Sequence, residues 1–179
     1  MKLIFLHGPP ASGKYTIARI LHATYGVHNF HNHLTIDVAK SLFDFGTDAF
    51  WDLTHRLRRT ALAARAELGD GNVVFTNCYS SPHDDSTVAA LEREITARGG
   101  EFIPVFLECS MEELRRRVAD PARAEMRKLH SIEGLEEFMS AWNITALDRP
   151  NTIVVKTDGR SARACAQEVA DVLLRKPQT

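Results

Sequence analysis

The stretch Gly8-Pro-Pro-Ala-Ser-Gly13-Lys14 decides the fold. It fits the pattern G-x-x-x-x-G-K, which is typical of a phosphate-binding loop, or P-loop. The two glycines let the backbone turn tightly, so that successive N–H groups form a nest for anionic oxygens. The helix that opens at Lys14 turns its positive end toward the same phosphates. We therefore predict a nucleoside triphosphate site, with the Lys14 ammonium on the β- and γ-phosphates.

The flanking sequence supports this prediction. Residues 3–6 form a short apolar run that predicts a buried strand directly before the loop. Residues 14–25 have a helical apolar face, and Gly26 stands where a helix end favours a left-handed residue. The residues expected to contact the nucleotide are Gly8, Pro9, Pro10, Ala11, Ser12, Gly13, Lys14, Tyr15 and Thr16.

Strands and helices alternate along the rest of the chain. Further strands are expected at residues 73–77, 102–108 and 153–155, and residues 28–33 form a strand or an extended loop. Helices are expected at 34–43, 48–68, 82–98, from 111, over much of 123–141, and at 161–175. This order predicts one α/β domain over residues 1–179, a three-layer α/β/α P-loop fold with a mainly parallel five-stranded sheet.

Three helices have specific expected features. In the helix at 34–43, Leu34, Val38 and Leu42 are in register as an apolar face. Ser81 is expected to cap the helix at 82–98, with Pro82 at its first position. The helix at 48–68 has an expected apolar stripe of Phe50, Leu53, Leu57, Ala61, Ala64 and Leu68.

The composition excludes several classes of protein. Lys and Arg total 22 against 23 Asp and Glu, which argues against nucleic acid held mainly by net charge. Three widely spaced cysteines exclude a disulfide framework and fit a reducing compartment. The apolar start of the chain ends at His7-Gly8, too early for a signal peptide or a membrane span. We expect a cytoplasmic protein without a membrane partner.

Residues 8–16, Gly-Pro-Pro-Ala-Ser-Gly-Lys-Tyr-Thr, resemble the loop of nucleoside monophosphate kinases. The rhythm of five strands, the length and the Arg-rich segment after the fourth strand also resemble this group, which includes shikimate kinase, gluconate kinase and antibiotic phosphotransferases. The resemblance covers the whole chain as architecture, but only the P-loop is specific as a motif. It implies an ATP-dependent kinase with a small helical lid.

Two positions depart from the pattern. Thr76-Asn77-Cys78-Tyr79 stands where adenylate kinases have Asp-Gly-x-Pro-Arg, and no second carboxylate stands at the tip of the third strand, so a clear Walker B Asp is missing. Tyr15 follows Lys14 where Ser or Thr usually holds Mg²⁺. Two interpretations are open: Thr16 serves the metal together with water, or the site binds nucleotide without turnover. Adenylate kinases have Gly and then Thr after the Lys, so we expect Thr16 to contact the Mg²⁺ of Mg-ATP.

The resemblance implies an acceptor region at about residues 28–69. His31 and His33 share one face if the chain is extended there, and Asp37 follows. These side chains either line the cleft and cap a helix, or bind the acceptor, with Asp37 orienting or deprotonating its hydroxyl. A zinc site lacks further ligands at close spacing.

Two arginines and one amide complete the expected acceptor site. Arg56 and Arg58 flank the apolar stripe of the helix at 48–68, so each either binds an anionic acceptor or lies at the surface. Asn77 stands at the carboxyl end of the third strand, where open α/β sheets bind ligands.

The resemblance also implies a lid at about residues 115–141. Arg117 and Arg123 lie on either side of Pro121, where a helix must stop or kink, and they are expected to stabilise the transferring phosphoryl group. Alternatively they belong to a solvated charged helix. Asp158, after the last strand, is expected beside the nucleotide base.

The sequence therefore predicts an ATP- and Mg²⁺-dependent kinase of a small hydroxyl- or phosphate-bearing molecule. The alternatives are a nucleoside monophosphate kinase, a non-catalytic nucleotide-binding module, and an antibiotic or nucleic-acid phosphotransferase. The acceptor, the base preference and the oligomeric state are left open.

Overall fold

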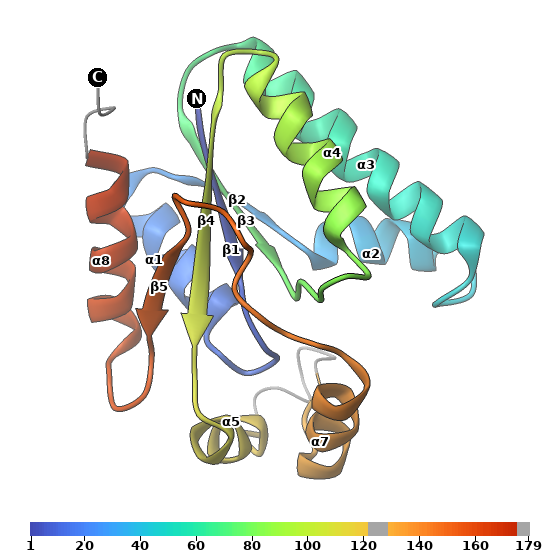
Figure 1. Ribbon diagram of the computed structural model, residues 1–179, viewed down its shortest axis with the longest axis vertical. Helices are drawn as coiled ribbons and strands as arrows, with labels where there is room; N and C mark the ends of the chain where they lie inside the picture. Colours follow the sequence, from blue (N-terminus) through green and yellow to red (C-terminus); the bar gives the residue numbers. More distant parts are fainter. Residues whose placement is uncertain (122–128, 175–179) are drawn as a thin grey trace.

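The computed structural model describes residues 1–121 and 129–174. Its centre is a five-stranded, entirely parallel sheet with the order β2-β3-β1-β4-β5 (Figure 1). The strands are β1 (Lys2–His7), β2 (His28–His31), β3 (Asn72–Asn77), β4 (Glu101–Glu108) and β5 (Ile153–Lys156). The fold class and the parallel sheet predicted from the sequence are confirmed.

β1 lies in the middle of the sheet because its side chains are apolar on both faces. Leu3 pairs with Val73 on one side and with Phe102 on the other. Leu3, Ile4, Phe5 and Leu6 are fully buried, as expected for a strand covered by helices on both faces. The P-loop that follows β1 is therefore held at the centre of the sheet's carboxyl edge.

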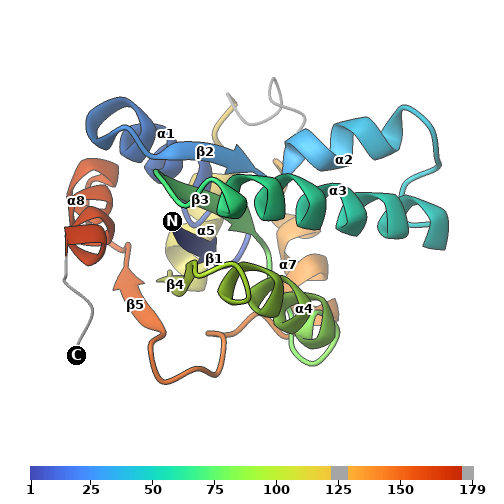
Figure 2. The same ribbon diagram turned by 90° about the horizontal axis from the view of Figure 1, so that it is seen from above.

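Helices cover both faces of the sheet (Figure 2). α1 (Lys14–Tyr25) and α8 (Ala162–Leu174) pack on one face, in a core with Ile4, Leu6 and Val105. α3 (Asp48–Glu67) and α4 (Asp85–Thr96) pack on the other face, around Phe5 and Phe75. α5 (Met111–Val118) and α7 (Ile132–Ala141) lie below the carboxyl ends of β1 and β4 (Figure 1).

The expected face of α2 (His33–Lys40) is wrong. Leu34, Val38 and Leu42 are exposed, whereas Thr35, Ile36 and Ala39 are buried. The small side chain of Ala39 lets α2 approach α3, where Ile36 and Ala39 pack against Phe50. Because the two helices pack closely, the buried face of α2 has smaller residues than the apolar pattern predicted.

The buried face of α3 also differs from the predicted stripe. Only Phe50 of that stripe is buried, and the other buried residues are Thr54, Arg58, Leu62, Ala63 and Ala66. Two of these are polar and have partners inside the protein: the Thr54 hydroxyl donates to the Phe50 carbonyl, and Arg58 donates to the Thr35 hydroxyl. A buried arginine breaks the assumption that the apolar side of a helix faces the core.

α4 begins later than the sequence indicated. Its first residue is Asp85 and its N-cap is Asp84, so Ser81 and Pro82 belong to the preceding turn. By contrast, α5 begins at Met111 as expected, where the Ser110 hydroxyl accepts from the Glu113 N–H, and the predicted left-handed Gly26 ends α1.

The segment predicted as a lid, about 115–141, contains the end of α5 and all of α7. Arg123 lies outside the described residues, so its predicted role stays a prediction. Among the helices of residues 1–121 and 129–174, none is long and apolar enough to cross a membrane.

Candidate nucleotide and acceptor site

The P-loop connects β1 to α1 by a turn that only glycine fits at its start. Gly8 has φ +149°, and a Cβ there would lie 2.8 Å from the Leu107 carbonyl oxygen of β4. Gly13 precedes α1 in the left-handed region, with φ 99°. The N–H groups of the first turn of α1 have no carbonyl partner within the helix, so they are free to bind anionic oxygens.

Lys14 lies across the loop. Its ammonium donates to the carbonyls of Gly8 and Pro9, at 2.8 and 2.7 Å. The Ser12 hydroxyl is buried without a hydrogen-bond partner in the structure. A buried hydroxyl needs a partner, and a phosphate oxygen in the loop would supply one. The loop therefore fits a nucleotide phosphate chain on an observation independent of the sequence pattern.

Tyr15 makes its ring contacts with residues outside the loop. Its ring contacts the His31 ring edge-to-face, with 5.2 Å between centroids, and lies under the Arg19 guanidinium. Tyr15 thus connects α1 to the end of β2, and it also lines the nucleotide end of the cavity. Thr16, the next residue, is exposed on the cavity that holds the P-loop.

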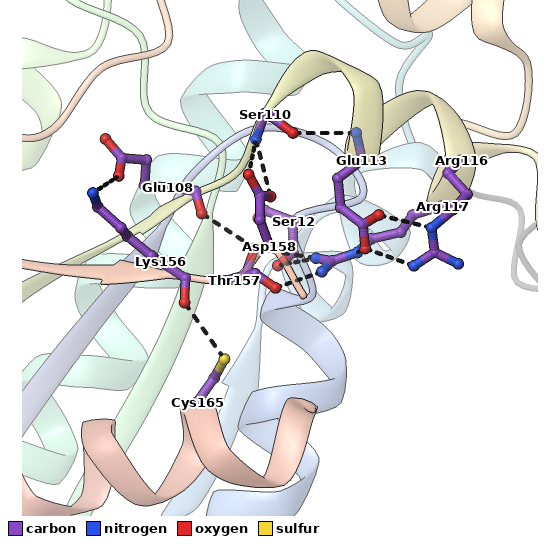
Figure 3. A network of polar contacts seen from close by, with 10 residues as sticks. All are labelled: Ser12, Glu108, Ser110, Glu113, Arg116, Arg117, Lys156, Thr157, Asp158 and Cys165. Atoms are coloured by element: carbon purple, nitrogen blue, oxygen red, sulfur yellow. Dashed lines mark hydrogen bonds and ion pairs between the residues drawn. The ribbon is translucent and has the colours of Figure 1, made fainter. Parts of the chain in front are cut away.

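Arg117 of α5 braces the P-loop against β5 (Figure 3). Its guanidinium donates to the Ser12 carbonyl at 3.4 Å and to the Thr157 carbonyl at 2.7 Å, and it also pairs with Glu113 at 2.7 Å. This arginine is mostly buried, with 20% of its side chain exposed. Arg117 is therefore already fixed at the nucleotide end of the cleft.

Glu113 holds two arginines at once. Its carboxylate accepts from Arg116 and Arg117, and these hydrogen bonds lower its pKa to about 2, with Arg116 as the larger cause. The Arg116 side chain is 72% exposed and lies on the cavity. Arg116 is consequently the arginine with room to move toward a bound phosphate.

Asp158 lies beside the cleft but does not line it. Its carboxylate accepts from the Ser110 N–H at 3.1 Å (Figure 3). Hydrogen bonds from the Cys109 thiol and then from the Ser110 N–H lower the pKa of Asp158. Burial raises the pKa of Cys109 to about 11. Asp158 connects the loop after β5 to the start of α5, while Gly159 and Arg160 line the cavity. The contact expected between Asp158 and the nucleotide base stays a prediction.

One cavity of about 1350 Å³ extends from the P-loop to α2, α3, α4 and α7. Single-ligand pockets usually measure about 300–1,000 Å³, so this volume has room for a nucleotide and a second ligand. Residues 10–17 line its nucleotide end. The residues that line the opposite, acceptor end include Asn32, His33, Trp51, His55, Arg58, Asn77, His83, Asp84 and Trp142.

Arg58 is the floor of the acceptor end. Only 6% of this residue is exposed, and it donates to the neutral side chains of Asn32 and Thr35 and lies over the Phe75 ring. Burial lowers its pKa to about 10, so the guanidinium is still charged at neutral pH. Among the described residues no carboxylate forms an ion pair with it. A buried cation without a paired anion favours an anionic ligand.

Two further groups line the same cavity and act electrostatically with Arg58. Asp84 accepts from the Ser80 N–H at 2.9 Å, and its charge raises the pKa of Arg58. Burial and then the Arg58 charge lower the pKa of His55, so its imidazole is neutral at pH 7. Sequence reasoning missed both residues, although the pair Asp84-Asp85 after the third strand was a visible signal.

The structure brings some predicted acceptor residues together and leaves others out. His33, Arg58 and Asn77 line the cavity. Asp37 is exposed on α2 and Arg56 is exposed on α3, paired with Asp52, because both point away from the α2–α3 contact. Neither lines the cavity, and the acceptor roles expected for them are not carried further.

His31 is also outside the cavity. It ends β2, whereas His33 begins α2, so the two histidines are not consecutive positions of one extended run. Their ring centroids are 6.3 Å apart. His31 contributes to the contact with Tyr15 instead of lining the acceptor end.

A metal at this site would depend on few protein ligands. Within the described part of the chain, no group of three or more His, Cys, Asp or Glu side chains is placed to hold a metal ion.

No protein-family model matches the sequence, and no curated protein matches it significantly. Solved structures do match. A sugar kinase from Janibacter has a TM-score of 0.67 at 16% identity, covering 99% of this chain and 96% of that one. Shikimate kinase from Acinetobacter baumannii, in complex with shikimate, has a TM-score of 0.59 at 18% identity, covering 99% and 95%.

A third solved structure contains an ATP analogue. The APS kinase from Mycobacterium tuberculosis, in complex with AMPPNP and APS, has a TM-score of 0.59 at 16% identity, covering 97% of this chain and 98% of that one. At these identities the likeness concerns the fold. The chain has the three-layer P-loop fold of these kinases.

Proposed function

We propose that the protein is an ATP-dependent phosphotransferase that acts on a small molecule. The acceptor oxygen forms a bond to the γ-phosphorus of ATP, the bond from that phosphorus to the β–γ bridging oxygen breaks, and ADP leaves. The observation that carries the proposal is the single cavity that joins the P-loop to the buried Arg58.

The nucleotide end supplies the positive charge that this transfer needs. The loop N–H groups bind the phosphates, and the Lys14 ammonium moves from the carbonyls of Gly8 and Pro9 to the β- and γ-oxygens. Arg117 holds the loop in shape, and Arg116 approaches the transferring group. Preorganised cations of this kind stabilise the charge that spreads over the phosphoryl oxygens.

The acceptor end positions the second substrate. Arg58 pairs with an anionic group of the acceptor, and Asn77 and His33 offer hydrogen bonds to its polar groups. Asp84 takes the proton of the attacking hydroxyl, since its carboxylate is held in place by the Ser80 N–H and lines the same cavity. This assignment replaces the exposed Asp37 as the acceptor base.

Mg²⁺ fits the nucleotide end as a partner of ATP. Thr16 is the residue that would hold it, directly or through water, and the metal would neutralise charge on the β- and γ-phosphates. A cytoplasmic location is also part of the proposal.

The test is ADP release from Mg-ATP against a panel of nucleoside monophosphates, hydroxy acids and sugars, with Lys14→Ala as the control. One acceptor should raise turnover well above background, and Lys14→Ala should abolish that increase. If the protein binds ATP but no acceptor stimulates ADP release, a nucleotide-binding module would be favoured. The presence of Tyr15 where the usual motif has Ser or Thr also supports that alternative. Failure to bind ATP would refute the proposal.

A further inference from the structure

Rings from distant parts of the chain surround the acceptor end of the cavity. We call them the aromatic wall, and its members are Phe45, Trp51, His55, His83, Phe138 and Trp142. They come from α3 and the loop before it, the loop before α4, and α7 with the residue after it. All six line the same cavity as Arg58.

The first half of the wall is built on α3. The Phe45 ring lies 5.7 Å from the Trp51 ring, and Trp51 stacks on His55 at 5.9 Å with 22° between the ring planes. Phe45 is 63% exposed although Phe50, its other neighbour, is fully buried. A large exposed ring beside a buried core offers apolar surface to a ligand.

The second half comes from α7 and the loop before α4. The Trp142 ring meets the His83 ring edge-to-face at 4.9 Å, and Phe138 lies 6.4 Å from Trp142. Trp142 is 37% exposed. Both halves line the same cavity. They therefore present their rings to the same space.

The aromatic wall and Arg58 offer a ligand different chemistry. The wall offers flat apolar faces, and the floor offers the buried guanidinium of Arg58, whose described hydrogen-bond acceptors are neutral. An open-chain polyol has hydroxyl groups on every side and would leave the rings without a partner. A flat ring buries against such faces, and its charged substituent can reach the floor.

We infer that the acceptor is a flat, ring-bearing hydroxyl compound with one anionic group. Its ring stacks on the aromatic wall, its anionic group pairs with Arg58, and its hydroxyl faces Asp84. This assignment rests on the proposed kinase function and narrows its substrate class.

The chain has two tryptophans, and both are in the wall, so tryptophan fluorescence, excited at a wavelength that tyrosine does not absorb, reports on this end of the cavity. The protein is first saturated with ADP, which occupies the nucleotide end. Two ring-bearing anions, uridine monophosphate and hydroxyphenylacetate, are then compared with two anions without a ring, gluconate and glycerol phosphate. At least one ring-bearing anion should change the fluorescence saturably, and the other pair should not.

Variants separate stacking from general packing. Trp51→Leu and Trp142→Leu should each weaken binding of the ring-bearing anion about tenfold, as expected for loss of one stacking face. Phe43→Leu is the matched control, because Phe43 is an exposed ring outside the cavity. Trp142 is partly exposed outside the buried core, so its variant keeps the test valid if Trp51→Leu destabilises the fold.

Binding of gluconate or glycerol phosphate in preference to both ring compounds would overturn the inference, as would no response to any of the four. Different outcomes test the kinase proposal and the ring-bearing acceptor. If gluconate drives ADP release, the kinase stands and the ring-bearing acceptor is wrong. If a ring-bearing anion binds but no acceptor drives turnover, the site assignment stands and the kinase is wrong.

Discussion

The two ends of the cavity are built in different ways. The phosphate loop at the nucleotide end comes from one continuous stretch, residues 8–16, and works mainly through backbone groups. The acceptor end is assembled from α2, α3, the carboxyl edge of β3, the start of α4 and α7, and works through side chains. The first needs a particular local conformation, whereas the second needs five segments to pack correctly.

The phosphate loop is a feature common to the fold, whereas the acceptor end is particular to this chain. The loop can be read as a motif because its glycines and its lysine have fixed spacing. The spacing of residues along the chain does not indicate that Arg58, Asp84 and Trp142 line the same cavity. The acceptor end is therefore where specificity is encoded, and the variants below test whether the two ends fail independently.

The largest effect is expected for Asp84→Asn. The amide keeps the size of the side chain but cannot take a proton, so kcat with the true acceptor should fall about 10²–10⁴-fold. The affinity for ATP, measured by calorimetry, should stay within about twofold because Asp84 belongs to the acceptor end.

Asp37→Asn is the matched control for that experiment. It removes a carboxylate that is exposed on α2 and lies outside the cavity. Its kcat should equal that of the unchanged protein. A large loss in Asp37→Asn with none in Asp84→Asn would restore the role that the sequence suggested for Asp37.

Gly8→Ala tests the nucleotide end. A Cβ would meet the Leu107 carbonyl oxygen at 2.8 Å, and φ +149° is unfavourable for any other residue. Strain of about 1–3 kcal/mol would displace the loop and weaken ATP binding about tenfold to hundredfold. Calorimetric titration with ATP measures this. Unchanged affinity would mean that the loop tolerates a shift of β4.

The same variant shows whether the ends are separable. Because the tryptophans lie at the acceptor end, their fluorescence response to a ring-bearing anion should survive in Gly8→Ala. Loss of both responses would indicate that the loop organises the whole cavity and would weaken the distinction drawn above.

The sequence predicted the parallel sheet, its strands and the loop because these depend on local patterns. Residues 3–6 are apolar on both faces, and glycines flank a fixed loop length. It misplaced the faces of α2 and α3 because their packing depends on partners. Ala39 is buried and Leu42 is exposed, since α2 approaches α3 closely on its small side.

The acceptor residues show the same limit. Arg56 and Arg58 looked equivalent beside the apolar stripe, but one is 69% exposed in its side chain and the other is buried. What distinguishes them is a pair of acceptors on α2, Asn32 and Thr35, more than twenty residues away along the chain. No pattern within one helix contains that information.

Arg58→Lys should have a moderate effect. Lysine retains the charge but loses the planar fork that holds Asn32 and Thr35. A charged hydrogen bond contributes about 1.5–3 kcal/mol, so KM for an anionic acceptor should rise about tenfold to hundredfold, with KM for ATP unchanged. Steady-state kinetics test this, and Arg56→Lys is the control on the same helix. Equal KM values in the two variants would contradict an anionic acceptor.

The smallest effect is expected for His7, which lines neither end of the cavity. It is fully buried between Phe5, Tyr79 and Phe106, and both ring nitrogens lack a hydrogen-bond partner in the structure. Burial, and then the charge of Lys14, lower its pKa from 6.5 to about 3. In the unfolded chain the ordinary pKa of 6.5 returns.

Between these two pKa values the unfolded state binds a proton that the folded state does not. Stability must therefore fall as the pH drops from about 6.5 toward 3, by about 1.4 kcal/mol per pH unit. His7→Phe replaces the imidazole by a ring that suits the same aromatic neighbours and does not titrate. Urea unfolding at pH 7 and pH 5 should show a smaller acid loss in the variant, by about 2 kcal/mol. An equal loss in both proteins would mean that His7 is protonated in the folded state, and that the core beneath the P-loop is more polar than the structure indicates.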